Sequence, residues 1–269
     1  MNSQLKLYGN AFLFCFLFTA IYVLVYFFVS PIYSEPSRPF HAFVGCLVAF
    51  GISYVFIKQD RRSWKEIGVS LQSSSIPNFL KGVLFGIFIM GTLVLAVVLF
   101  SSFSIHTNTN ASLLNFLLST AVLLPLAYME ELAFRGYPLL ILKEGTSTRI
   151  ALVSTSILFA LYHIANNWTF QTAFLGAGVW GVVYGIAALY SKGLAMPTGL
   201  HYAANLTTSA FSVKSGGAAL WVLTTKSGSS LEEYQASELE TLLQQLGLLI
   251  FAILVMESYI RFERNKLQH

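Results

Sequence analysis

The sequence predicts an all-α protein, a polytopic membrane helix bundle of about eight transmembrane helices in a single domain, 1–269, with its site in the bundle core. Of the 269 residues, 55% are apolar and only 10% are charged, whereas an ordinary soluble domain has roughly 25% charged residues. The mean hydropathy is +0.66. Long apolar runs without alternating polar residues favour helices over a barrel in lipid. We therefore expect no strands.

Eight apolar runs, each near the roughly 20 residues that cross a bilayer, define the expected helices in order. The first has bulky side chains and no small-residue cleavage site, which favours an uncleaved span over a secretory signal. The third and sixth contain the pairs Gly82/Gly86 and Gly181/Gly185, which indicate close packing between helices. The fourth is the longest and includes two prolines. The runs cover residues 11–30, 40–57, 82–103, 113–142, 149–164, 170–190, 194–211 and 246–262.

The charged residues predict the topology. With the N-terminus inside, twelve of the 16 Lys and Arg residues fall in cytoplasmic segments, three fall outside, and Arg135 lies within a span. Because basic residues near span ends are held on the cytoplasmic side, we expect a multi-pass protein of the cell membrane with both termini cytoplasmic. The net charge of +4 is scattered along the chain, which argues against a nucleic-acid partner. The membrane itself is the expected environment.

Two long connections and two cysteines complete the outline. Residues 58–81 are expected to form a cytoplasmic interfacial segment, because apolar side chains alternate there with charges and serines. Residues 212–245 are expected to form an external polar loop with a short amphipathic helix. Cys15 and Cys46 both lie inside apolar runs, so neither a disulfide framework nor a cysteine-ligated zinc is predicted.

Ionisable side chains inside spans are costly and indicate function. Residues four apart share one face of a helix, so Glu131 is expected to pair with Arg135. Glu130 lies about 100° around the same helix and is left free. His163 closes the fifth run, and His201 lies in the seventh. Counted from the cytoplasmic ends, the side chains of four residues, Glu130, His163, His201 and Asn205, all lie about 14 to 21 Å deep, so we expect one buried pocket, open toward the cytoplasm.

A glutamate, two histidines and an asparagine in a dry pocket suit the attack of water on a carbonyl. Glu130 could act as general base, with His163 sharing the proton or holding the water. His201 and Asn205, four residues apart, could donate hydrogen bonds to the oxyanion. This interpretation needs no cofactor. The alternative is a zinc ion held by Glu130, His163 and His201 with an open position for water, although the helical HExxH pattern is absent.

Three motifs in this order resemble the CPBP family of intramembrane proteases. They are EExxxR at Glu130, Glu131 and Arg135, FxxxH at Phe159 and His163, and HxxxN at His201 and Asn205. The family includes the type II CAAX prenyl proteases and proteins associated with bacteriocin processing and immunity. The resemblance spans about 113–205 and places a catalytic core at about 113–211.

The resemblance implies specific roles. The first glutamate and first histidine, Glu130 and His163, activate water, while His201 and Asn205 form the oxyanion hole. Glu131 and Arg135 are supporting residues, and Phe159 packs beside His163. The implied activity is an intramembrane endopeptidase acting on a membrane-associated protein or peptide, in CAAX-type or bacteriocin-related processing; family members often carry a metalloprotease label.

Other functions stay open at this point. A non-catalytic immunity or scaffold protein could use the same buried groups to bind a partner. A proton-coupled transporter could use them as a proton relay, although the sequence shows no inverted repeat. Elsewhere, Glu257 is expected to pair with Arg261, four residues on. The sequence predicts no oligomeric state.

Overall fold

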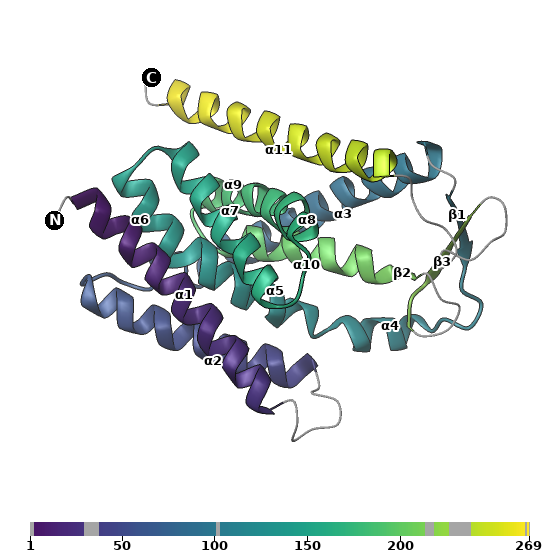
Figure 1. The fold of residues 1–269 in the computed structure, drawn as a ribbon, viewed down its shortest axis with the longest axis horizontal. Helices are drawn as coiled ribbons and strands as arrows, with labels where there is room; N and C mark the ends of the chain where they lie inside the picture. The colour runs from purple at the N-terminus through teal and green to yellow at the C-terminus, as the bar shows by residue number, and fades with distance from the viewer. Residues whose placement is uncertain are drawn as a thin grey trace.

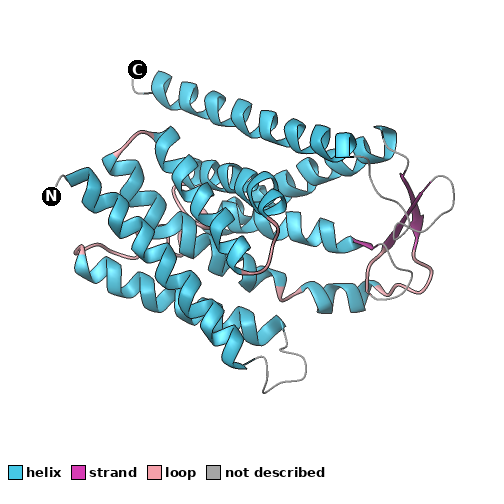
Figure 2. Ribbon diagram, in the orientation of Figure 1, coloured by secondary structure: helices cyan, strands magenta, loops and turns pink. Residues whose placement is uncertain are grey.

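A computed structural model describes residues 3–29, 38–100, 103–212, 218–225, 238–266 and 268. Helices make up most of this part of the chain (Figure 2). The two ends of the chain lie at one end of the molecule, opposite a small sheet (Figure 1). In chain order the helical elements are α1 (Ser3–Val29), α2 (Arg38–Gln59), α3 (Ser75–Phe100), α4 (Leu113–Thr120), α5 (Leu123–Glu131), η1 (Leu132–Gly136), α6 (Tyr137–Gly145), α7 (Thr148–Ala165), α8 (Phe170–Thr172), η2 (Ala173–Gly178), α9 (Val179–Ser191), α10 (Ala195–Ala210) and α11 (Glu238–Lys266).

The helices confirm the predicted fold class. Within the described residues, 7 helical segments are long and apolar enough to cross a membrane. They correspond to all the predicted runs except 194–211, which forms α10, a helix of 16 residues. The protein is therefore an all-α bundle and a multi-pass membrane protein.

The fourth run is one span built from several segments. α4 and α5 are followed by η1, a π-helical turn, and then by α6. Pro138 lies in the first turn of α6, where its missing N–H breaks no helical hydrogen bond. π-Turns are frequent at functional sites, and this one carries Arg135.

The expectation of no strands is wrong. β1 (Phe103–Thr107) pairs antiparallel with β3 (Trp221–Thr225), and β2 (Phe211–Ser212) pairs parallel with β3. These strands lie in the connections between spans, at the end of the molecule away from the termini (Figure 1). Segments of 2 to 5 residues are too short to show alternation in the sequence. Of the predicted external loop, 213–217 and 226–237 lie outside the described residues.

Glycines bring α10 against α3, as the sequence predicts for Gly82 and Gly86. A Cβ on Gly82 would collide with the carbonyl of Met196, and one on Gly86 would lie 2.6 Å from the Ala203 side chain. From the α10 side, a Cβ on Gly199 would collide with the Phe79 carbonyl. This close packing fixes the depth and rotation of α10 and therefore of His201, two residues further on.

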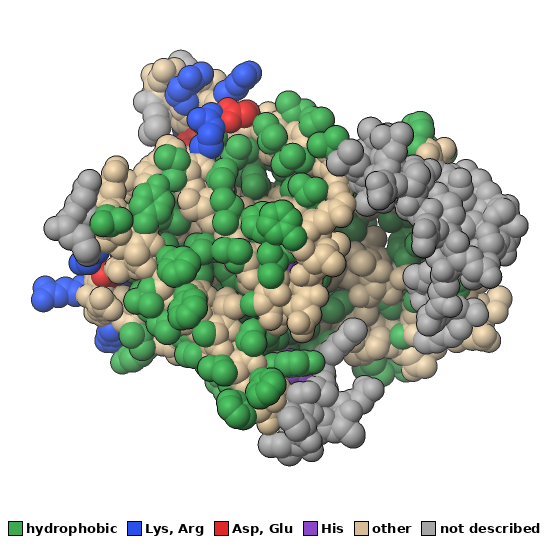
Figure 3. All heavy atoms as spheres, in the orientation of Figure 1, with side chains coloured by type: hydrophobic (Ala, Val, Ile, Leu, Met, Phe, Trp, Pro, Cys, Tyr) green, Lys and Arg blue, Asp and Glu red, His purple; other side chains and the backbone are tan. Residues whose placement is uncertain are grey.

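Ion pairs attach α11 to α6 and α7, and they correct one expectation. Glu257 pairs with Arg149, with Oε2 2.7 Å from Nη2, and not with Arg261, because two parallel hydrogen bonds from one guanidinium fit a carboxylate well. Lys143 pairs with Glu263 at 2.8 Å. Charged side chains gather at the end of the molecule that carries the two termini, whereas hydrophobic ones cover much of the middle of the face shown in Figure 3.

Candidate active site

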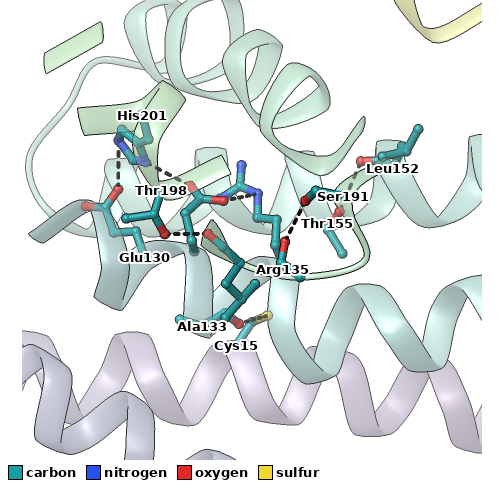
Figure 4. Close-up of polar contacts among 12 residues, drawn as sticks. Cys15, Glu130, Ala133, Arg135, Leu152, Thr155, Ser191, Thr198 and His201 are labelled. Carbon is teal, nitrogen blue, oxygen red and sulfur yellow. Dashed lines mark hydrogen bonds and ion pairs between the residues drawn. The ribbon is translucent and has the colours of Figure 1, made fainter. Parts of the chain in front are cut away.

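Three helices bring three of the four predicted catalytic residues together in the core. Glu130 lies at the end of α5, His163 in the last turn of α7 and His201 in the middle of α10. Nε2 of His201 is 3.6 Å from Oε2 of Glu130, and Figure 4 shows the two side chains directed toward each other. His163 interacts electrostatically with both. The three side chains form one polar cluster within an apolar bundle.

Glu131 binds both a cation and a histidine. Its Oε2 lies 3.4 Å from Nε of Arg135, and both side chains are 0% exposed. The ion pair expected from the sequence is therefore present. In addition, Oε1 accepts a hydrogen bond from Nδ1 of His201 at 2.8 Å. Because a carboxylate can only accept here, Nδ1 carries a proton and Nε2 is the nitrogen that faces Glu130.

Arg135 lies among aromatic rings. Its guanidinium carbon is 4.1 Å from the centroid of Phe159 and 5.4 Å from that of Tyr184, distances at which a cation is attracted to a ring face. The Phe159 ring also contacts His163 edge-on, with centroids 4.5 Å apart. Phe159 therefore packs beside His163, as predicted, and in addition covers the Arg135 charge.

The tautomer of His163 follows from its backbone contact. Nδ1 lies 2.9 Å from the carbonyl oxygen of Phe159, which can only accept, so Nδ1 carries the proton. The edge of the ring packs against Trp168, with centroids 4.5 Å apart. Nε2 is then the available acceptor of a neutral ring, which suits a group that holds or receives a proton from water.

Among the described residues, Asn205 forms no hydrogen bond or ion pair with the cluster. It follows His201 by one turn of α10 and is half-buried. Its side-chain amide forms no hydrogen bond within the described part of the chain. The donor NH₂ of Asn205 is therefore available to a ligand on the face of α10 that carries His201.

Two tyrosines belong to the site and were not predicted from the sequence. The hydroxyl of Tyr162 donates to Oε1 of Glu130 at 3.3 Å. The ring of Tyr184 stacks on His201, with centroids 4.4 Å apart and planes 14° from parallel. Tyrosine is common in this chain, so its presence beside a motif carries little signal. The position of Tyr162 directly before His163 is the one sequence clue.

The zinc alternative finds no matching ligand set. Among the described residues, no group of three or more His, Cys, Asp or Glu side chains is arranged to hold a metal ion. We therefore derive no step through a metal.

The fold and the site together define a class: a multi-pass membrane helix bundle whose core holds two glutamates, an arginine and two histidines from successive helices. Residues 109–207 match the family model described as "Type II CAAX prenyl endopeptidase Rce1-like". The match includes all seven residues of the three motifs. It confirms the resemblance over this segment and supports membership of the CPBP family, a family of proteases. Searches of curated proteins and of solved structures found no match.

Proposed function

We propose that the protein is an intramembrane endopeptidase that hydrolyses a peptide bond with water activated by Glu130. One observation carries the proposal. The Glu130 carboxylate, 15% exposed, is held by the Tyr162 hydroxyl and faces a histidine that a second, fully buried glutamate orients. Hydrolysis without a covalent intermediate requires a base that water can reach and a fixed hydrogen-bond donor beside it.

The steps follow from these positions. Glu130 takes one proton from a water molecule while the water oxygen attacks the carbonyl carbon of the scissile peptide. Nε2 of His163 accepts the second hydrogen of that water as a hydrogen bond and orients its attack. The carbonyl π electrons move to the oxygen, and Nε2–H of His201 and the Asn205 amide donate to this oxyanion. Glu130 then returns its proton to the leaving nitrogen as the C–N bond breaks, which yields a carboxylic acid and an amine.

Glu131 and Arg135 act through His201 in this proposal. The Glu131 hydrogen bond to Nδ1 fixes the rotation of the imidazole. Arg135 balances the charge of Glu131 and is itself held by Phe159 and Tyr184. These residues position the donor and touch no reacting atom.

Substitution of Glu130 tests the proposal. Glu130→Gln in purified protein should abolish peptide cleavage, because the amide has no basicity, while the melting temperature stays near that of wild type. Glu257→Gln is the matched control, since it makes the same change in a carboxylate that pairs with Arg149 on α7. Retained turnover in Glu130→Gln would overturn the mechanism and leave binding or transport functions, for which uptake into proteoliposomes is the direct assay.

The substrate class and topology are further parts of this proposal. CAAX-type or bacteriocin-related peptides are the candidates, and both termini are assigned to the cytoplasm within the cell membrane. The shared location of the two chain ends supports the second assignment (Figure 1). A comparison of membrane and secreted peptides between a wild-type strain and a Glu130→Gln strain would identify the substrate as the peptide that accumulates uncleaved.

A further inference from the structure

Helix α7 ends shortly after His163 in a Schellman motif, with Asn166 as its C-cap. The N–H of Trp168 donates to the carbonyl of His163, and the N–H of Asn167 donates to the carbonyl of Ile164, both at 3.0 Å. Asn167 is in the left-handed region, with a φ of 67°, as the residue after the C-cap is in this motif. The backbone therefore holds Trp168 at a fixed position relative to His163.

The side chain of Trp168 packs on the imidazole of His163. The two ring centroids are 4.5 Å apart, and the ring planes are 70° from parallel. In a Schellman motif the second residue after the C-cap frequently contacts the residue five positions before it, which stabilises the end of the helix. Here that earlier residue is a candidate catalytic histidine. The contact that ends α7 is therefore also a contact with the candidate site.

Within the described residues, three aromatic rings contact the imidazole of His163. Besides Trp168, they are Phe159 and Tyr162, with centroids 4.5 and 5.1 Å from that of the imidazole. Phe159 and Tyr162 are 1% and 4% exposed, whereas Trp168 is 48% exposed. His163 itself is buried. Of the three rings, the indole of Trp168 is therefore the one that separates the imidazole from the outside of the bundle.

The orientation of the imidazole depends on one hydrogen bond and on this packing. Nδ1 of His163 lies 2.9 Å from the carbonyl oxygen of Phe159, which leaves Nε2 as the acceptor of a neutral ring. A half-turn about the Cβ–Cγ bond would break this hydrogen bond and displace both nitrogens. Because this torsion has broad minima in histidine, the surrounding rings have to keep the imidazole in place.

We propose that Trp168 is a positioning residue for His163: its indole closes the outer side of the imidazole and keeps Nε2 in place as the acceptor for the attacking water. The part that concerns water rests on the proposed function. The packing itself does not, and it can be measured in a protein that cleaves nothing. An exposed tryptophan at the end of a span can also act as an anchor at the membrane interface, a role that would not involve His163.

Acylation by diethyl pyrocarbonate measures the packing directly, because this reagent reacts with an unprotonated imidazole nitrogen. In Trp168→Ala, His163 should be acylated several-fold faster than in the wild type, as followed by peptide mass mapping. His201, which is held by Glu131, is the internal control, and its rate should be unchanged. An unchanged rate at His163 would overturn the proposal. An equal increase at both histidines would also overturn it, since it would indicate a general loosening of the bundle.

The kinetics of peptide cleavage test the positioning role. Trp168→Ala should lower kcat about tenfold with little change in KM, because complete loss of a proton-transfer group costs about 100-fold or more. Trp168→Phe retains a ring against the imidazole and should recover most of kcat. The matched control is Trp221→Ala, which removes an indole that is 37% exposed and stacks on Phe211 in the sheet, and it should leave kcat unchanged. Full turnover in Trp168→Ala, or an equal loss in Trp168→Phe, would contradict the proposal.

Asn167 offers a test that retains the indole and covers the case in which Trp168→Ala does not fold. Glycine adopts a φ of 67° readily, whereas valine is branched at Cβ and does so only at high cost. Asn167→Val should therefore show faster acylation of His163 and a lower kcat than Asn167→Gly. Equal acylation in the two variants would overturn the proposal. If the wild type cleaves no peptide, the proposed function fails, while the acylation rates still decide whether Trp168 holds His163.

Discussion

Nδ1 of His201 donates a hydrogen bond of 2.8 Å to Oε1 of Glu131. This contact joins α10 to α5 and determines which nitrogen of the imidazole faces Glu130. Because Glu131 is also paired with Arg135, the orientation of a residue on one helix depends on a charge pair on another. The two adjacent glutamates thus have different functions in the proposed mechanism: Glu130 is the base and Glu131 positions the donor.

Removal of the Glu131 charge tests whether Glu130 and Glu131 have these different functions. Glu131→Gln keeps the size of the side chain but removes the negative charge that holds Nδ1–H of His201. We expect kcat for peptide cleavage to fall about 100-fold, a typical contribution of a positioned proton donor, with KM nearly unchanged. The control is Glu144→Gln, which alters an exposed carboxylate bonded to Arg62 and should leave kcat at the wild-type value. A similar decrease in both variants would contradict a positioning role.

Arg135 is expected to matter most for stability. Arg135→Met leaves the fully buried Glu131 carboxylate without its cation, and breaking a buried pair in this way costs about 3–5 kcal/mol of unfolding free energy. Chemical denaturation in detergent micelles measures the loss.

A double-mutant cycle separates the pair from the individual residues. The Glu131→Gln and Arg135→Met double variant removes both charges, so it should lose clearly less than the sum of the two single losses. Additive losses would mean that the two side chains do not interact energetically.

The bundle and the pairing of Glu131 with Arg135 could be predicted from the sequence because each depends on local spacing. Apolar runs of bilayer length define spans, and residues four apart meet on one helix face. The short strands β1 and β3 escaped prediction because they pair across more than one hundred residues. The partner of Glu257 was missed for the same reason, since Arg149 lies on another helix.

The residues of the candidate site could be predicted from the sequence, but the hydrogen bonds between them could not. The motifs identify Glu130, His163 and His201, whereas the bond from His201 to Glu131 depends on how α10 packs against α5. The contribution of Tyr162 likewise depends on the rotation of α7, which no spacing within one helix determines. Contacts between helices therefore determine the hydrogen bonds of the site, which could not be predicted from the sequence.

Gly181 is expected to be intolerant of a side chain. A Cβ at this position would lie 3.0 Å from Oγ of Ser156 and 3.1 Å from Nη2 of Arg135. Gly181→Ala should therefore lower the free energy of unfolding by about 1–3 kcal/mol, as overpacking does in other cores, and should also reduce turnover by displacing Arg135. Gly91→Ala on α3, where a Cβ meets nothing within 4 Å, is the control and should be neutral or stabilising. Equal melting temperatures of the two variants would contradict the close approach.

Tyr162 provides a test of the base itself. The hydroxyl of this residue is a donor to Glu130, and a hydrogen bond to a charged group contributes about 1.5 kcal/mol at the lower end of its range. Tyr162→Phe removes only this oxygen, so the free Glu130 carboxylate is held less firmly and kcat should fall about tenfold at 1.4 kcal/mol per factor of ten. Tyr128→Phe makes the same change on α5, in a ring that packs against Phe50, and should leave kcat unchanged. If both variants have the kcat of the wild type, Glu130 is positioned by other groups. If kcat falls only in Tyr162→Phe, the Tyr162 hydroxyl helps to hold the Glu130 carboxylate in place.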